Sequence, residues 1–170
     1  MMIEAINTLY DYNRRATEQV LTTAEGLTQA QWLAAQTAGR GSIRDTLVHL
    51  VAGMRLWLVT WGGSLPPEEA ARPSVESGDF PDVAAVRSHF RLIDEAVQRY
   101  LDGLTPEMLA EVRTRKFSDG PETRLPLWQM VLSVTYHSMQ HRSEVAAMLT
   151  AAGHSPGELG LTTFLPSVPA

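Results

Sequence analysis

The sequence contains no cysteine among its 170 residues. This absence excludes disulfide bonds, thiolate zinc sites and a catalytic cysteine within the chain. A soft metal ligand therefore has to be an imidazole nitrogen, and any thiol chemistry has to come from a cofactor or a substrate. The sequence also lacks a long run of Lys or Arg, and its formal net charge is -5. We therefore expect no nucleic-acid partner, because clustered cations bind phosphate backbones.

Long apolar segments are missing as well. No stretch approaches the roughly 20 apolar residues that span a bilayer, so we expect no membrane partner. The first residues, Met1 to Asn7, lack the basic start and apolar stretch of a signal peptide, and we expect a cytoplasmic protein. Hydrophobic residues make up 44% and charged residues 19% of the chain, which indicates a folded protein. The length suits one helical domain over residues 1–170.

What the sequence does have is helical periodicity. Apolar residues recur at intervals of three and four over about residues 2–24, 43–61, 82–102 and 126–152. Ser42 precedes the second segment as a favourable N-cap residue, with Asp45 near the positive end of the helix dipole. Four amphipathic helices of this length predict an all-α fold, a four-helix bundle. The longer connections permit a crossover topology, but spacing alone leaves the arrangement of the helices open.

The connections carry their own signals. Residues 62–80 are interrupted by glycines and prolines and predict a long loop without secondary structure. Thr28 to Gln31 has the form of a capping box and predicts a short helical turn, and Thr105 before Pro106 predicts another. Residues 111–118 partly alternate and are followed by Asp119-Gly120, which favours a small hairpin. We expect the tail to pack over the bundle through Leu161, Phe164 and Leu165.

Two of the five histidines lie four residues apart in the last helix. His137 and His141 therefore share a helix face, which is one way to present two imidazoles to a metal. Apolar residues lie near the same face and predict that the pair points inward: Met130, Val134, Val145 and Met148. The alternative is two polar residues at a helix boundary, of which one is satisfied by a hydrogen bond.

His49 lies in an apolar run of the second helix, beside Ala52, Gly53 and Leu56. The two small neighbours leave room for a metal or a facing helix, although a single histidine in such a run also suits a hydrogen-bonded core position. Burying three imidazoles without partners would be unfavourable, and one divalent metal would satisfy all three. His49, His137 and His141 are therefore the candidate metal ligands.

Other polar residues near this group have open roles. Glu144 suits a fourth ligand, an acceptor for a ligand's second nitrogen, or a surface carboxylate. Arg142 suits an anion-binding group at the mouth of the site or a solvated side chain. We expect His89 and His154 at the surface. Four residues are candidate pocket walls or ordinary packing residues: Tyr10, Asn13, Trp57 and Tyr136.

The pattern resembles the DinB family (DinB/YfiT-like metalloenzymes) over most of the chain. Tyr136 to Arg142 is similar to the family's H-x-x-x-H-R segment, and the chain continues with Met148-Leu149, Gly153 and the apolar tail. Gly41 to Leu50 is similar to the segment of the first family histidine, and Tyr12 to Thr17 matches the opening helix loosely. One departure stands out: the family often continues H-R-G-Q, whereas this chain has Ser143 and Glu144 after Arg142.

The resemblance implies a four-helix bundle with a three-histidine site for a divalent metal, in which His49, His137 and His141 are the ligands. It implies nickel or zinc, with iron or manganese as alternatives, and a homodimer. Three protein ligands leave positions open, as in catalytic sites. The resemblance favours a transferase that uses a low-molecular-weight thiol as a small-molecule substrate. A metal-dependent hydrolase, a non-catalytic metal-binding stress-response protein and a metal-free interaction domain remain alternatives.

Overall fold

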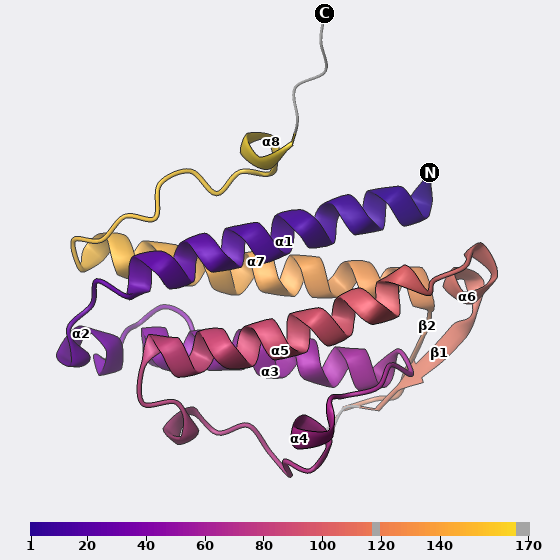
Figure 1. The fold of residues 1–170 in the computed structure, drawn as a ribbon, viewed down its shortest axis with the longest axis horizontal. Helices are drawn as coiled ribbons and strands as arrows, with labels where there is room; N and C mark the ends of the chain where they lie inside the picture. Colours follow the sequence, from indigo (N-terminus) through magenta and orange to yellow (C-terminus); the bar gives the residue numbers. More distant parts are fainter. Residues whose placement is uncertain (117–119, 166–170) are drawn as a thin grey trace, which may run out of the picture.

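The computed structural model describes residues 1–116 and 120–165. Within them, four long helices form a bundle (Figure 1): α1 (Met2–Ala24), α3 (Ile43–Thr60), α5 (Val83–Asp102) and α7 (Leu127–Ala151). The helices correspond to the four predicted segments within a residue or two at each end. The prediction of an all-α four-helix bundle is confirmed.

The ends of these helices are determined by capping hydrogen bonds and by backbone conformation at nearby residues. The hydroxyl of Ser42 accepts a hydrogen bond from the backbone N–H of Asp45 at 3.1 Å, and Asp82 caps α5 through the N–H of Ala85 at 2.9 Å. The short helix α2 (Gln29–Leu33) opens with the predicted capping box of Thr28. Gly153 follows α7 with a φ of +87°, a left-handed conformation that residues other than glycine rarely adopt.

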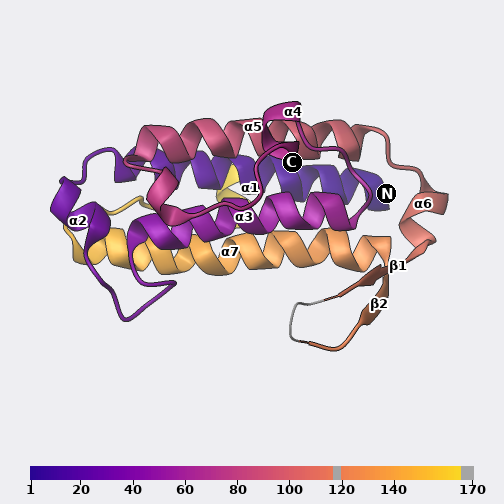
Figure 2. The same ribbon diagram turned by 90° about the horizontal axis from the view of Figure 1, so that it is seen from below.

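The bundle has one long crossover connection. Figures 1 and 2 show that α1 and α7 run in one direction and that α3 and α5 run in the other. The segment between α3 and α5 therefore returns along the length of the bundle. Around the bundle, α7 packs between α1 and α3, and α5 contacts the other side of both. This arrangement makes α3 and α7 antiparallel neighbours.

The crossover connection was predicted as a loop without secondary structure, and this prediction is wrong. It contains the short helix α4 (Pro67–Ala70) and the 3-10 turn η1 (Ser77–Asp79). Pro67 occupies the first position of α4, where its missing N–H leaves no hydrogen bond unmade. Four residues are too few to show helical periodicity, and the sequence pattern could not reveal this element.

A buried carboxylate fastens the crossover connection to the bundle. Glu69 of α4 is 2% exposed. Its oxygens lie 3.3 Å from Nε of Arg55, 3.3 Å from Nε of Arg72 and 3.1 Å from Nδ1 of His89. Arg55 also donates hydrogen bonds to the carbonyl oxygens of Glu69 and Arg72. The connection is therefore attached to α3 through Arg55 and to α5 through His89.

The segment between α5 and α7 folds as predicted. Helix α6 (Pro106–Ala110) precedes an antiparallel pair of strands, β1 (Val112–Arg115) and β2 (Thr123–Pro126), in which Val112 pairs with Pro126. The predicted turn at Asp119-Gly120 begins with a residue that lies outside the described part of the chain. The tail forms α8 (Leu161–Phe164), and it packs on α1 because Tyr12 donates to the carbonyl of Leu159 and contacts the ring of Phe164.

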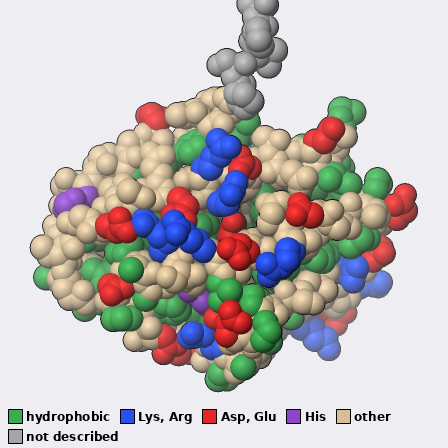
Figure 3. Space-filling model, in the orientation of Figure 1, with side chains coloured by type: hydrophobic (Ala, Val, Ile, Leu, Met, Phe, Trp, Pro, Cys, Tyr) green, Lys and Arg blue, Asp and Glu red, His purple; other side chains and the backbone are tan. Residues whose placement is uncertain are grey.

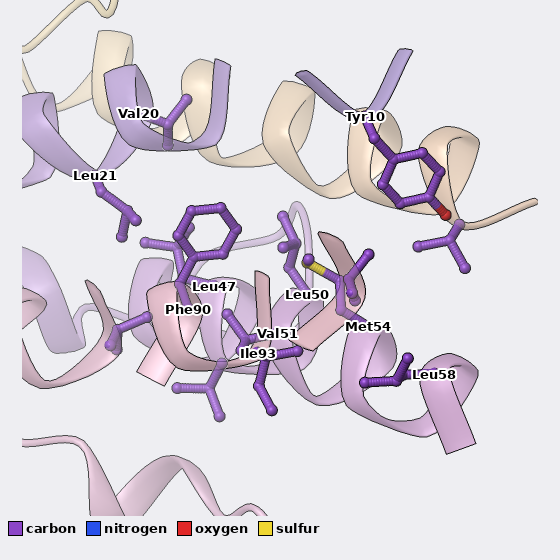
Figure 4. Close-up of a cluster of buried hydrophobic side chains, with 14 of the residues drawn as sticks. Tyr10, Val20, Leu21, Leu47, Leu50, Val51, Met54, Leu58, Phe90 and Ile93 are labelled. Atoms are coloured by element: carbon purple, nitrogen blue, oxygen red, sulfur yellow. The ribbon is translucent and has the colours of Figure 1, made fainter. Parts of the chain in front are cut away.

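The core lies between the four long helices. Figure 4 shows part of it, with side chains from α1, α3 and α5 pointing toward one another: Tyr10, Val20, Leu21, Leu47, Leu50, Val51, Met54, Leu58, Phe90 and Ile93. Burial of each large apolar side chain contributes roughly 1.5–3 kcal/mol. The hydroxyl of Tyr10 donates to the carbonyl of Val131 on α7 at 2.8 Å, so the buried polar atom is satisfied.

The exterior carries charges of both signs. Figure 3 shows basic and acidic side chains intermingled on the face of the molecule that it displays. Glu18 of α1 pairs with Arg87 and Arg91 of α5, and Arg87 also pairs with Glu25. None of the helices in the described part of the chain is long and apolar enough to cross a membrane.

Candidate metal centre

Three histidines meet where α3 packs against α7. His49 comes from α3, and His137 and His141 lie one turn apart on α7. The ring centroids are 5.3 Å apart for His49 and His137, 4.7 Å for His49 and His141, and 4.5 Å for His137 and His141. One nitrogen from each ring lies within 4.8 Å of the other two. The helix packing therefore converts a distant residue and an i, i+4 pair into one compact group.

The separation of two of the nitrogens fits ligation of one metal ion. The Nε2 atoms of His49 and His137 are 3.3 Å apart. Tetrahedral zinc with nitrogen ligands at about 2.0–2.1 Å places those ligand atoms about 3.3–3.4 Å from one another. The Nδ1 atom of His141 contacts Glu144, so Nε2 is the nitrogen of this ring that remains for a metal. The three imidazoles can thus offer one lone pair each to a single divalent ion.

The surroundings of the site keep two of these imidazoles neutral. Burial lowers the pKa of His49 to about 4, and the neighbouring Arg40 and His141 lower it further. Burial likewise lowers the pKa of His137 to about 4, with further contributions from the two other histidines. A neutral imidazole has the free lone pair that a metal ligand needs. Among the described residues, Nδ1 of His137 is a buried atom without a hydrogen-bond partner.

Gly53 provides the space for one of the rings. A Cβ atom at this position would lie 2.5 Å from Cε1 of His137 and 3.2 Å from its Nδ1. The ring of His137 therefore rests directly on the backbone of α3, one turn after His49. The sequence pointed to room beside His49, and the structure shows that the imidazole of the facing helix occupies it.

Glu144 takes one of the three roles that the sequence left open. Its Oε2 atom lies 2.6 Å from Nδ1 of His141, and its Oε1 atom accepts a hydrogen bond from Nε2 of Gln140 at 3.1 Å. Burial acts to raise the pKa of Glu144, but the hydrogen bonds from His141 and Gln140 outweigh it and hold the pKa below its usual value. Glu144 is thus an ionised acceptor behind His141.

Arg142 has neither of the predicted roles. It is 2% exposed, so it is neither solvated nor at the mouth of the site. Its Nη1 atom donates to the side-chain and backbone oxygens of Asn13 and to the hydroxyl of Thr17 at 3.3 Å. The guanidinium also lies 5.2 Å from the centre of the Tyr12 ring. Arg142 therefore points away from the histidines and joins α7 to α1.

The two remaining histidines are less exposed than predicted. His89 is 6% exposed because the carboxylate of Glu69 comes to it from the crossover connection and Phe80 covers its ring at 5.1 Å. His154 is partly buried because the turn after α1 approaches it: a Cβ on Gly26 would lie 3.1 Å from its Nδ1.

The four candidate wall residues are dispersed. Tyr10 belongs to the core, Asn13 is buried under Arg142, and Tyr136 is 67% exposed. Trp57 is partly buried and lies on α3 one turn after Gly53. The guanidinium carbon of Arg115, from β1, is 3.8 Å from the centre of the Trp57 ring. Sequence reasoning missed Arg115 because its contact with Trp57 joins two residues that are far apart in the sequence.

Comparisons with known proteins agree with this architecture. A family model described as the DinB superfamily matches residues 12–145, which include all three histidines. A crystal structure described as a DinB-like protein from Bacillus cereus ATCC 10987 has the same fold, with a TM-score of 0.65. The two chains are 16% identical, and the match covers 91% of this chain and 95% of the other. None of the curated proteins matches the chain significantly.

Proposed function

Since the chain belongs to the DinB superfamily, we propose that it is a divalent-metal-dependent enzyme in which His49, His137 and His141 hold the metal. The observation that carries the proposal is the convergence of three imidazoles at the contact of α3 with α7. Among the described residues, no carboxylate lies within ion-pairing distance of His49 or His137. A divalent cation bound here would accept one lone pair from each of the three imidazoles.

The chain's own residues perform separate tasks at this site. The three imidazoles supply the donor atoms, Gly53 lets the ring of His137 approach α3, and Glu144 holds His141. When bound, a divalent metal with three protein ligands has open positions at which it can polarise a substrate or lower the pKa of a water or a thiol.

We propose that the reaction is the transfer of a chemical group to or from the sulfur of a low-molecular-weight thiol. The chain has no cysteine, so the sulfur nucleophile would be part of a substrate. Imidazole ligands suit nickel and zinc as well as iron, and the first two are the metals we propose. Hydrolysis and non-catalytic metal storage use the same ligands, and turnover measurements separate them.

Metal analysis of the full chain, purified without an affinity tag, tests the ligand set. We expect about one equivalent of metal, and a loss of most of it in His49→Ala and in His137→Ala. His154→Ala is a matched control, because it removes an imidazole outside the site. Unchanged metal content in His49→Ala and His137→Ala would refute the ligand assignment.

Activity is tested with a panel of low-molecular-weight thiols and electrophilic acceptors, and with ester substrates in parallel. We expect thiol-dependent turnover that chelation abolishes and metal restores. Ester hydrolysis without a thiol would favour the hydrolase, and turnover that survives complete chelation would exclude metal catalysis. The homodimer implied by the family resemblance stays a prediction, which sedimentation velocity can test.

A further inference from the structure

We infer that Glu144 is a positioning residue that fixes the tautomer of His141 and thereby determines which ring nitrogen faces the other two histidines. The inference rests on the proposed metal site, because the nitrogen left facing His49 and His137 is the one that would bind the metal. It adds a residue outside the ligand set that decides whether the third ligand is ready to bind.

The contact between the two side chains is short and sheltered. Oε2 of Glu144 lies 2.6 Å from Nδ1 of His141, and His141 is 5% exposed. This distance is slightly shorter than the roughly 2.7–2.9 Å of charge-assisted N–H···O hydrogen bonds. The side chain of Glu144 is 24% exposed, so the carboxylate lies at the edge of the bundle and can stay ionised. The hydrogen bond is therefore shielded from water mainly on the histidine side.

The carboxylate is itself held in place. Gln140 donates from Nε2 to the other oxygen, Oε1, at 3.1 Å. Gln140 precedes Glu144 by four residues and His141 precedes it by three, so both donors lie on the turn before it on the same helix face. With one donor on each oxygen, rotation of the carboxylate would break at least one of these hydrogen bonds.

The direction of the hydrogen bond follows from charge. An ionised carboxylate only accepts hydrogen bonds, so Nδ1 of His141 has to carry the proton. A neutral imidazole with its proton on Nδ1 has its lone pair on Nε2. The proton at Glu144 thus assigns Nε2 of His141 to the site, the same atom type that His49 and His137 bring together.

The alternative roles fit the contacts less well. A fourth ligand would have to leave both Gln140 and His141, and Glu144 lies outside the described group of residues whose donor atoms converge. A plain surface carboxylate would not be expected to have each oxygen engaged by a separate side chain. Histidine ligands commonly donate their second N–H to a carboxylate, and loss of that acceptor weakens metal affinity about 10–100-fold.

The first experiment is performed on the full chain without metal, at a pH where the imidazoles are neutral. Nitrogen-15 NMR of the imidazole rings distinguishes the two tautomers. We expect wild-type His141 to carry its proton on Nδ1, and Glu144→Ala to lose this preference. Glu144→Gln keeps an oxygen that can accept the hydrogen bond and should restore it. An unchanged His141 tautomer in Glu144→Ala would overturn the inference.

The second experiment measures zinc affinity by competition with a chelator. We expect Glu144→Ala to bind zinc 10–100-fold more weakly than the wild type, and Glu144→Gln to lie between them. Glu158→Gln is the control for loss of one negative charge, because Glu158 is an exposed residue of the tail, and its affinity should equal that of the wild type. Equal affinities in Glu144→Ala and the wild type would overturn the inference.

The two proposals fail in different ways. If neither the wild type nor any variant binds zinc, nickel, manganese or iron, the proposed function is refuted, while the NMR result for His141 still decides the role of Glu144. If the wild type binds metal and Glu144→Ala binds it equally well with the same tautomer, only the role of Glu144 is refuted. Thermal melts of the variants show whether each remains folded.

Discussion

Replacement of Gly53 by alanine should weaken metal binding more than it lowers the stability of the folded protein. The added methyl group would lie 2.5 Å from Cε1 of His137, whereas carbon atoms in contact are about 3.5–4.0 Å apart. The ring, the helix or both would therefore have to move by roughly 1 Å. Because α3 and α7 are packed along their length, we expect the imidazole to take up most of this displacement.

Two effects on folding oppose each other in this variant. Alanine favours a helix interior over glycine by about 1 kcal/mol. An extra methyl group in a packed region costs about 1–3 kcal/mol. We therefore expect the free energy of unfolding of the metal-free protein to fall by at most about 2 kcal/mol.

The effect on metal binding should be larger than the effect on stability. A metal site tolerates displacements of about 0.5 Å, and movement of His137 would change its 3.3 Å separation from His49. We expect zinc affinity to fall at least 10-fold, measured by chelator competition beside urea denaturation of the metal-free protein.

A double-mutant cycle gives the control. In a His137→Ala background the ring is gone, so Gly53→Ala should stabilise the metal-free protein by about 1 kcal/mol, the difference in helix propensity. The reasoning would be refuted if Gly53→Ala kept wild-type zinc affinity, or if it destabilised the His137→Ala protein as much as the wild type.

Three further predictions follow from buried ionisable groups. The pKa values of His49 and His137 are depressed to about 4 each, so below pH 6.5 the unfolded chain binds protons that the folded chain does not. The metal-free protein should therefore lose a few kcal/mol of stability between pH 6.5 and 4. A urea denaturation midpoint that does not change over this pH range would contradict the prediction. Burial raises the pKa of Asp94 to about 6, so this residue stabilises the protein less as the pH rises through 6. Asp94→Asn should therefore raise the free energy of unfolding by about 2 kcal/mol at pH 7.5 but not at pH 4. Equal effects of the substitution at the two pH values would count against this prediction. Glu69→Gln should lower the free energy of unfolding by about 3 kcal/mol, because its three partners would no longer face a buried negative charge. As a control in the same denaturation assay, Glu68→Gln alters an exposed neighbour and should change the free energy of unfolding by no more than about 0.5 kcal/mol.

The elements that the sequence predicted are those with local causes. The period of apolar residues and the caps at Ser42 and Thr28 depend on residues within a few positions of each other, and they located the long helices and α2. The hairpin was indicated by the alternation before Asp119-Gly120. The element that was missed, α4, has only four residues and is held by partners that are distant in the sequence.

In the candidate site, too, the features set by neighbouring residues could be predicted, and those set by distant residues could not. His137 and His141 could be paired from their spacing on one helix, but their approach to His49 depends on α3 and α7 being neighbours. The predictions for Arg142 and His89 were wrong because each obtains a distant partner. Arg142 obtains Asn13, 129 residues away, and His89 obtains Glu69 from the crossover connection. Burial of a polar residue cannot be read locally when its partner lies on another element.

The meeting of His49 with His137 has a consequence for the chain as a polymer. The two residues are 88 positions apart, and an ion bound by both would act as a reversible crosslink across that span. In the chain-entropy model, an ion that stayed bound to both residues on unfolding would raise the free energy of the unfolded ensemble by roughly 4–5 kcal/mol, through the entropy lost on closing a loop of this length. A chain without cysteine would thereby gain a tether like that of a disulfide bond, formed and released by metal supply instead of by oxidation.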